Sequence, residues 1–389
     1  MYIGMDVHKN CCQIVQMDEE GEIVEKHSIE TSIKGLDELS RKVPNNAKIA
    51  LEASTSGKFV YRHLKKKGLK ILMAHPRSLR LIAESKDKDD WKDAIALAKL
   101  LRMNCLPESY VPSDEIESIR ELIRHRVSLG QKVTIAKNQI HAILAGNGVK
   151  HGFSDLFGKN GLFYLSKLEL PESSQLVLES HLRELGYYKD EIELINIRLA
   201  QIAKDDEDVE LLMTIPGIDY YSALAILGEI GDISRFSEAK KLTRYSGLTP
   251  GIRQSGKITY RGRMTKEGPS ILRWILTQNA RVLVKMNSTK LSRQYQKLSK
   301  RIGKKKAIIA IARKLLVIIY HMLTERKSFE ERNDDLIYRK TGRLRQKAKV
   351  SLRPDLLNRM DALKTKGTGF LHELADPDVC TPSRSFGAG

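Results

Sequence analysis

Four aspartates crowd into one short stretch of a chain that is otherwise strongly basic: Asp87, Asp89, Asp90 and Asp93. Apolar residues at spacings of three and four follow, from Ala94 to Leu101, and predict a helix. On that helix the carboxylates of Asp90 and Asp93 project from one face. They repel unless a cation lies between them, and hard ions such as Mg²⁺ take such oxygen ligands. The alternative is a solvated helix start, because acids favour first turns; taken alone, the run favours this second interpretation.

The elements that would position these acids are predicted by the first 75 residues. Ile3, Met5 and Val7 alternate with polar or small neighbours, which is typical of a strand. Two further strands over 11–17 and 22–27 follow short turns, giving three adjacent antiparallel strands. The next segments predict helix 32–42, strand 48–53, helix 57–67 and strand 69–74, before the acidic helix. This order indicates a ribonuclease-H-like α/β fold.

Two more acids occupy informative places in that order. Asp6 lies in the first strand among apolar neighbours, where an unpaired charge is costly. Glu52 ends the fourth strand, and α/β sheets tend to carry functional groups at strand ends. The first and fourth strands are neighbours in a ribonuclease-H-like sheet, so Asp6 and Glu52 could meet, with Asp90 and Asp93 completing a two-metal site for phosphoryl chemistry. Incidental surface acids would explain Asp90 tolerably and Asp6 poorly.

The middle of the chain predicts a helical arm. Residues 113–144 read as one long helix with an apolar stripe, capped by Ser113 or Asp114. A loop-like segment with glycines follows, and then a second helix over about 174–203. Two long helices joined by a loop predict an antiparallel coiled-coil arm that separates domains or dimerises.

The last third is basic and mainly helical. The Ile215-Pro-Gly-Ile218 step before a helix resembles a helix-hairpin-helix that could hold a phosphate, although an ordinary helical connection explains it equally well. Between Lys257 and Lys306 fifteen Lys or Arg residues face one acid, Glu267, which indicates an anionic partner. Ser255 is expected in a loop, and on local grounds a turn residue is favoured over a nucleophile. Residues 307–324 predict a core helix, and the end of the chain a flexible basic tail.

Composition limits the class of protein. The 389 residues carry a net charge of +19 with a pI near 9.6, which points to nucleic acid as the partner. No apolar run approaches the ~20 residues of a membrane-spanning helix, and no secretory signal is visible. The four cysteines have no CxxC spacing, so neither a zinc site nor a disulfide framework is expected. The expected compartment is a reducing cytosol.

Several motifs together resemble one family. They are Gly4-Met-Asp6-Val-His-Lys9, Leu51-Glu52-Ala-Ser, Lys88-Asp-Asp90-Trp-Lys-Asp93-Ala94, Ile215-Pro-Gly-Ile218, Tyr245-Ser-Gly-Leu-Thr-Pro250, Gln254-Ser-Gly256 and Lys266-Glu-Gly-Pro-Ser-Ile-Leu-Arg273. Over residues 1 to about 324 the chain is similar to the DEDD transposases of bacterial insertion sequences, the insertion-sequence one-hundred-and-ten family. Where this family usually has a hydroxyl residue before the first Asp of the helix, the chain has Asp89. This leaves open whether Asp89 or Asp87 also binds metal, and the tail after about 340 has no counterpart.

The resemblance implies a RuvC-like domain in which Asp6, Glu52, Asp90 and Asp93 bind Mg²⁺. It implies that Ser255 is the nucleophile and forms a transient phosphoserine link to DNA. It also implies a non-coding bridge RNA that pairs with target and donor DNA. A homo-oligomer, dimer or tetramer, would bring one subunit's carboxylates to another's serine. The DNA and RNA backbone would contact six basic residues: Arg253, Lys257, Arg261, Arg263, Lys266 and Arg273.

The leading hypothesis is therefore a transposase or recombinase of the bacterial cytoplasm, associated with the nucleoid. Its parts would be a catalytic domain (1–112), the coiled-coil arm (113–205), a mainly α transposase domain with the serine (206–324) and a basic tail (325–389). One alternative is a junction-resolving nuclease that uses the same acids and a water nucleophile. Another is a nucleic-acid-binding protein without chemistry.

Overall fold

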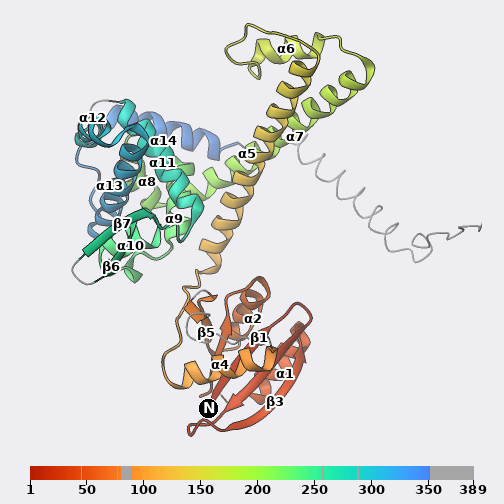
Figure 1. Ribbon diagram of the computed structural model, residues 1–389, viewed down its shortest axis with the longest axis vertical. Coiled ribbons are helices and arrows are strands. Elements are labelled where there is room, and N and C mark those ends of the chain that lie inside the picture. Colours follow the sequence, from red (N-terminus) through yellow and green to blue (C-terminus); the bar gives the residue numbers. More distant parts are fainter. Residues whose placement is uncertain (45, 77, 80–88, 256–257, 287–288, 351–389) are drawn as a thin grey trace, which may run out of the picture. The chain divides into compact units, whose positions relative to one another are not determined.

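The chain forms two compact units, Met1–Pro112 and Ser113–Gly389 (Figure 1). The computed structural model describes residues 1–44, 46–76, 78–79, 89–255, 258–286 and 289–350. Each unit is described by itself.

A five-stranded mixed sheet is the centre of the first unit. Its strands are β1 (Tyr2–Val7), β2 (Cys11–Met17), β3 (Ile23–Glu30), β4 (Lys48–Glu52) and β5 (Lys70–Ala74). They lie in the order β3-β2-β1-β4-β5, with β1 antiparallel to β2 and parallel to β4. The predicted α/β architecture and the pairing of the first and fourth strands are confirmed, and the order is consistent with a ribonuclease-H-like domain.

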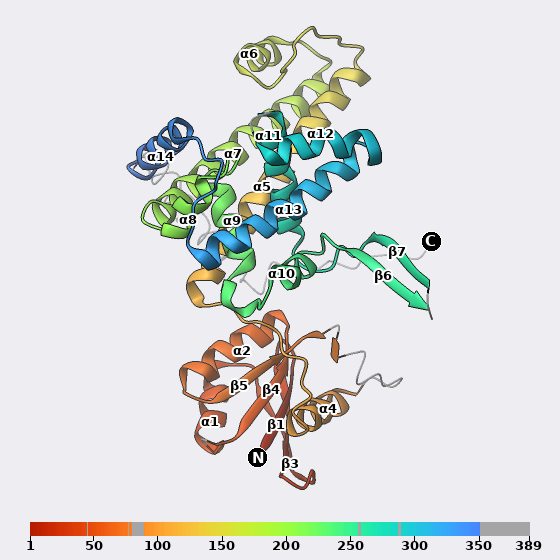
Figure 2. The same cartoon turned by 90° about the vertical axis from the view of Figure 1, so that its left-hand side faces the viewer.

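Helices cover both faces of this sheet (Figure 2). On one face, α1 (Ile33–Lys42) and α2 (Thr55–Lys66) bury Leu36 and Leu64 against Ile3 and Met5 of β1. On the other face lies α4 (Asp90–Arg102), whose Leu97 and Leu101 form a second core with Ala50 and Ala74. Alternation along β1 sends Ile3 and Met5 into the first core and leaves Gly4 and Asp6 on the α4 side.

Gly4 lets α4 approach the backbone of β1 directly. A Cβ atom on Gly4 would lie 1.9 Å from the carbonyl oxygen of Ala94 and 2.7 Å from the backbone nitrogen of Ala98. Ala94 and Ala98 are fully buried, and they are four residues apart on one helical face. Only glycine on the strand and small side chains on the helix permit this contact, which holds the first turn of α4 beside the end of β1.

The second unit begins with two long helices that lie side by side in both views, α5 (Asp114–Gly146) and α7 (Glu172–Ala203) (Figures 1 and 2). Ser113 caps α5, as predicted, by accepting a hydrogen bond from the Ile116 backbone N–H. The loop-like interpretation of the intervening segment is wrong for α6 (Lys159–Lys167), a short helix that buries Leu165. Its glycines had suggested irregular chain, whereas Gly161 is needed because a Cβ there would meet the Leu156 carbonyl oxygen.

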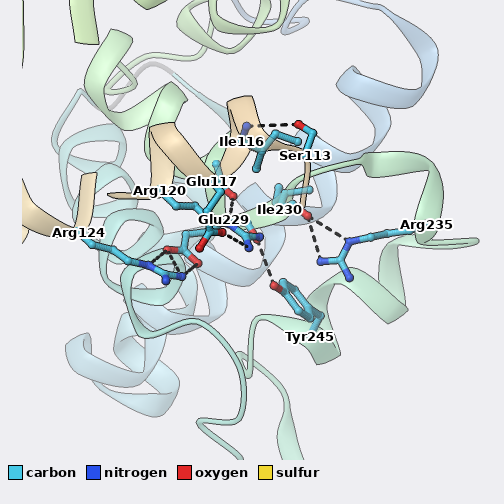
Figure 3. Close-up of polar contacts among 10 residues, drawn as sticks. Ser113, Ile116, Glu117, Arg120, Arg124, Glu229, Ile230, Arg235 and Tyr245 are labelled. Atoms are coloured by element: carbon cyan, nitrogen blue, oxygen red, sulfur yellow. Dashed lines mark hydrogen bonds and ion pairs between the residues drawn. The ribbon is translucent and has the colours of Figure 1, made fainter. Parts of the chain in front are cut away.

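The first turns of α5 are bound to the end of α9 (Tyr220–Ile230) by polar contacts (Figure 3). The Arg120 guanidinium donates to the Gly228 and Glu229 carbonyl oxygens at 2.5 and 3.2 Å. The Tyr245 hydroxyl also donates to the Glu229 carbonyl, and the Arg235 guanidinium donates to that of Ile230. The last carbonyls of a helix have no intrahelical partner, so these three side chains satisfy the end of α9. Buried Glu229 in turn pairs with Arg124.

The remaining elements of this unit are mainly helical. They are α8 (Glu207–Met213), the 3₁₀ turn η1 (Ile233–Arg235), α10 (Ala239–Tyr245), the hairpin strands β6 (Pro250–Ser255) and β7 (Ile258–Met264), α11 (Ser270–Lys285), α12 (Lys290–Ile302), α13 (Lys304–Glu325) and α14 (Asp334–Ala348). Buried side chains of α5, α7, α9, α11 and α13 share one core. The Ile215–Ile218 step joins α8 to α9, which contact each other; phosphate binding there stays a prediction.

The predicted core helix is confirmed as α13. Ile311, Leu315 and Ile319 are fully buried in the shared core. By length and composition alone, this 22-residue helix could also cross a membrane, so the expectation that no apolar run approaches that length was too strict. Burial in the core accounts for its apolar character.

The prediction of a flexible tail from residue 325 is wrong for α14. Leu344 is buried in the shared core, and Lys347 pairs with Glu193 of α7. The Lys340 ammonium donates to the Met213 and Ile215 carbonyl oxygens at 2.7 and 2.8 Å. The apolar pattern of α14 is thin because lysines make much of its contact, and such long-range contacts leave no periodic signal. Residues 351–389 lie outside the described chain.

The Gly4 contact predicts opposite effects for two Gly→Ala substitutions. Gly4→Ala should lower the free energy of unfolding of the first unit by about 1–3 kcal/mol, because the new methyl group overpacks the α4 interface. The matched Gly130→Ala on α5, where a Cβ meets nothing, should raise stability by up to about 1 kcal/mol through helix propensity. Trp274→Phe leaves Trp91 on α4 to report unfolding of the first unit, and Trp91→Phe leaves Trp274 on α11 to report unfolding of the second unit, which contains Gly130. Fluorescence in urea titrations of Gly4→Ala in the first background and Gly130→Ala in the second measures the two changes. Equal effects of both substitutions would contradict this account.

Burial of Lys340 predicts a pH dependence of stability. Burial lowers the pKa of Lys340 to about 8 from an ordinary 10.5, opposed by the charge of Asp219. The folded state therefore disfavours the ammonium, and this cost is complete below pH 8 and disappears as the pH rises to about 10.5. Over that interval wild type should gain at most about 3 kcal/mol relative to Lys340→Met. Urea titrations at pH 7.5 and 10 measure the difference, with exposed Lys349→Met as the control; a constant difference would refute the burial argument.

Candidate carboxylate site and serine hairpin

Asp6 and Glu52 occupy neighbouring positions on parallel strands. Met5 of β1 pairs with Leu51 of β4, so the next residues along both strands are Asp6 and Glu52. Both follow the face that carries Gly4 and Ala50, which is the face covered by α4. Adjacent strands lie about 4.8 Å apart, so the sheet brings these two predicted site residues together.

The acidic helix reaches Asp6 through an imidazole. His8 Nε2 lies 2.9 Å from Asp6 Oδ2 and 3.2 Å from Asp90 Oδ2. One ligand atom from each of these three residues falls within 4.8 Å of the others, a grouping that could hold a metal ion. Asp6 is largely buried, whereas His8 and Asp90 are about half exposed. The cluster is therefore anchored in the sheet and open at its outer side.

The electrostatics of the cluster favour a bound cation. Burial raises the pKa of the Asp6 carboxyl above its ordinary value. His8 opposes that shift, while the negative charges of Asp90 and Asp93 add to it. Asp93 therefore acts on the same carboxyl from the next turn of α4. Carboxylates held this close disfavour one another's charge, and a divalent ion would relieve that repulsion.

Asp89 has a local structural role. It is the N-cap of α4, and its Oδ1 accepts a hydrogen bond from the Trp91 backbone N–H at 3.1 Å. Ser, Thr and Asp are all good N-caps. The cap role explains how Asp89 can stand where a hydroxyl residue is usual, and it commits one of its oxygens to the helix start. Asp87 lies outside the described residues.

His8 is the residue that sequence reasoning missed. It belonged to the quoted Gly4–Lys9 motif but was assigned no role. The available signal was its spacing: residues two apart along a strand share a face, so His8 follows Asp6 toward α4. An imidazole also widens the range of suitable ions, because carboxylate sites suit Mg²⁺ and Mn²⁺ while imidazole suits softer ions.

Ser255 lies in a strand, and the predicted loop is wrong at that position. It is the last residue of β6, paired with Ile258 of β7. The sequence signal was two short runs separated by Gly256-Lys257, typical of a hairpin. The described structure does not include the side chains of Arg253, Ser255 and Arg261, nor any part of Lys257. Arg263 and Lys266 are exposed.

Two of the quoted motifs cross at the base of this hairpin. Gly247 and Gly268 have φ of 68° and 84°, and a Cβ on Gly268 would lie 1.9 Å from the Tyr245 carbonyl oxygen. Arg273 fixes the crossing, since its Nη1 donates to the Ser246, Glu267 and Gly268 carbonyl oxygens at 2.8–3.1 Å. Its structural contacts position the hairpin, and its predicted contact with nucleic acid stays a prediction.

Comparison with known proteins matches both halves of this arrangement. Residues 3–147 match a family model described as a transposase, of the DEDD type of IS110 (insertion sequence one-hundred-and-ten). Residues 209–296 match the model described as the transposase IS116/IS110/IS902 family. The chain belongs to the IS110 family of DEDD transposases. The first match contains Asp6, Glu52, Asp90 and Asp93, and the second contains Ser255.

Two relatives named as transposases match most of the chain, and a third relative matches part of it. The transposase for insertion sequence element IS1111A of Coxiella burnetii is 26% identical over 333 residues, covering 84% of this chain and 90% of the relative. A putative transposase of Sinorhizobium fredii is 26% identical over 360 residues, covering 83% and 88%. A pilin gene-inverting protein of Moraxella bovis is 38% identical over 125 residues, 31% of this chain and 38% of the relative. The chain is thus an enzyme of the DNA transposase/recombinase class.

The cluster predicts a metal-dependent stability that Asp6 controls. Mg²⁺ or Mn²⁺ at 100 times its Kd should stabilise the wild-type first unit by about 2.7 kcal/mol. Asp6→Asn should be more stable than wild type without metal, because a buried and repelled charge is removed, and should gain little from metal. Thermal unfolding of these proteins in the Trp274→Phe background, followed by Trp91 fluorescence with and without EDTA, measures both effects. Exposed Glu38→Gln should behave as wild type, and an equal metal response in Asp6→Asn would exclude Asp6 as a ligand.

Proposed function

We propose that this transposase cleaves and rejoins DNA strands through a divalent-metal carboxylate site and a transient phosphoserine link at Ser255. The observation that carries the proposal is the grouping of Asp6, His8 and Asp90 at the carboxyl end of the central strand β1 in a chain of the IS110 family. A cluster of this kind suits chemistry on a phosphate, which itself supplies further oxygen ligands to the metal.

The first unit would hold the metal with its own carboxylates. Asp6 and Asp90 are the inner pair, Asp93 adds charge from the next helical turn, and Glu52 occupies the adjacent strand end. The ion, which we propose to be Mg²⁺, would polarise the scissile phosphate and lower the pKa of a bound hydroxyl group. The protein's part is positional: β1, β4 and the Gly4 contact fix the carboxylates before any substrate arrives.

Ser255 would supply the nucleophile. Its Oγ attacks the phosphorus, the Oγ proton passes to a base, and the bond to the leaving sugar oxygen breaks as that oxygen takes up a proton. The new phosphoserine ester keeps the energy of the broken phosphodiester, so a second strand can rejoin by the reverse step without ATP. Because Ser255 ends β6 on a hairpin, a DNA strand would be able to reach it.

The two halves of the site lie in different compact units, Met1–Pro112 and Ser113–Gly389. We propose that a homo-oligomer, dimer or tetramer, joins one subunit's carboxylates with another's serine, and that the α5–α7 pair serves as a coiled-coil arm in that assembly. We further propose that a bridge RNA directs target and donor choice, that the basic residues around the hairpin contact both nucleic acids, and that the enzyme works in the bacterial cytoplasm at the nucleoid.

The serine assignment predicts a covalent adduct. On DNA carrying the element's ends, wild type with Mg²⁺ should form a protein–DNA adduct that survives denaturation, and mass spectrometry should map it to Ser255. Ser255→Ala should lose the adduct and strand exchange by a factor of about 10³ or more, as expected when a nucleophile is removed. Ser299→Ala, a serine whose hydroxyl donates to the Gln296 carbonyl on α12, is the control.

Two outcomes would favour the alternatives. Cleavage by Ser255→Ala at the wild-type rate would indicate a junction-resolving nuclease with water as nucleophile. Binding without cleavage by the wild type, unchanged by Asp6→Asn, would leave only a nucleic-acid-binding role.

A further inference from the structure

A groove of about 980 Å³ runs between the base of the β6–β7 hairpin and helix α13. Its hairpin side includes Pro250, Gly262 and Met264, and its helix side extends from Lys305 to Val317. The whole groove lies within the second unit, on described residues. None of the motifs quoted from the sequence includes its α13 wall.

The rim of the groove is cationic. Six lining residues are exposed Lys or Arg, and no acid lines the groove: Arg263, Lys266, Lys305, Lys306, Arg313 and Lys314. Among the described residues none of these six pairs with a carboxylate, and Lys314 donates to the Gln294 side-chain oxygen. Six uncompensated cations this close repel one another, so the groove is built for a polyanion.

The floor of the groove is apolar. Ile309 and Val317 of α13 face Leu248 and Met264 across it, and all four are buried or half-buried. A duplex presents phosphates and sugars to such a surface and keeps its bases stacked inside. A single strand presents base faces as well, and single-strand sites combine a positive groove with side chains that contact base faces, usually aromatic ones. In this groove the aliphatic side chains of the floor would take that place.

The two kinds of side chain alternate along α13. Lys305 and Lys306 are followed one turn later by Ile309 and Ala310, then by Arg313 and Lys314, then by Val317. This is one helical stripe, since the members recur at intervals of three and four. The two basic pairs are separated by eight residues, about 12 Å along the helix axis. A single strand placed along the stripe can direct phosphates to the basic pairs and a base to the apolar step between them.

The first turn of α13 adds to this preference. Lys304, Lys305 and Lys306 follow Gly303, which provides no side-chain cap, and no acid lies in that turn. Cations at a helix N-terminus are disfavoured by the helix dipole. A phosphate in the groove would offset both the dipole and the repulsion among the lysines.

We propose that this groove binds single-stranded DNA, holding the strand that the hairpin serine acts on. The groove meets the hairpin at Pro250, which pairs with Met264, while Ser255 pairs with Ile258 at the far end of β6. Ser255 lies five positions beyond Pro250 along β6, about 17 Å away in an extended strand. The groove therefore holds DNA beside the reacting position, without overlapping it. The choice of DNA as the strand depends on the proposed function, whereas the preference for a single-stranded polyanion comes from the groove itself.

The test uses the full chain and a fluorescent thymidine 20-mer, with binding followed by anisotropy at several salt concentrations. Lys306→Ala with Arg313→Ala should raise Kd at least tenfold. It should also reduce the slope of log Kd against log salt by about 1.4, because each lost phosphate contact on a single strand contributes about 0.7. The matched control, Arg281→Ala with Lys285→Ala, removes two exposed cations from α11, outside the groove, and should change Kd less than twofold.

A second variant tests the floor. Val317→Asn keeps every charge, so it should weaken the 20-mer without altering the salt slope, and it should leave binding of a 20-base-pair duplex unchanged. Circular dichroism melting verifies that each variant is folded. Equal losses in the groove and control doubles would overturn the proposal, as would a loss confined to duplex DNA or to a uridine 20-mer RNA.

Adduct formation separates this proposal from the proposed function. If wild type forms the Ser255 adduct and the groove double variant binds and reacts like the control, the groove assignment fails alone. If wild type forms no adduct, yet the groove double variant binds the single strand more weakly than wild type does, the groove assignment holds and the serine chemistry fails.

Discussion

The direct contact between helix α4 and strand β1 at Gly4 is the constraint on which the first unit depends. The Ala94 carbonyl oxygen occupies the space that any larger residue at position 4 would need. Because Asp6 and His8 follow Gly4 on the same face of the chain, and Asp90 lies one turn before Ala94, this contact sets the spacing of the carboxylates. The site is therefore positioned by a helix–strand packing distance, and the acids themselves work against it by repulsion.

In the second unit the corresponding constraint is the attachment of the β6–β7 hairpin to a helical core. Two glycine-bearing loops cross at the hairpin base, and Arg273 binds three of their carbonyl oxygens. The end of α9 is closed by Arg120, Arg235 and Tyr245, which attaches α5 to the same core. Arginine suits both positions because it carries five N–H donors, which let Arg273 reach three carbonyl oxygens through Nη1 and Arg120 reach two through Nε and Nη2. Part of the chain's positive charge is thus structural.

The two units also carry clusters of opposite charge. The first gathers carboxylates around Asp6, where burial and repulsion raise the carboxyl pKa and favour a cation. The second gathers lysines and arginines along the hairpin and α13, where repulsion favours a polyanion. Each surface repels itself when empty. A divalent ion would reduce the repulsion among the carboxylates, and the phosphates that accompany such an ion would reduce the repulsion among the lysines and arginines.

Local periodicity in the sequence predicted the succession of strands in the first unit, the long helices and the α13 core. A charge placed where charge is costly also made Asp6 a candidate site residue, which stays a prediction. Only the folded chain shows that His8 joins Asp6 to Asp90 and that α14 packs on α7 and α8, whereas the N-cap role of Asp89 and the strand position of Ser255 are local and carried a sequence signal. The contacts of His8 with Asp90 and of α14 with α7 and α8 join residues that are far apart in the sequence. A contact such as Lys340 with the Met213 carbonyl leaves no periodic pattern in the chain, so packing alone could reveal it.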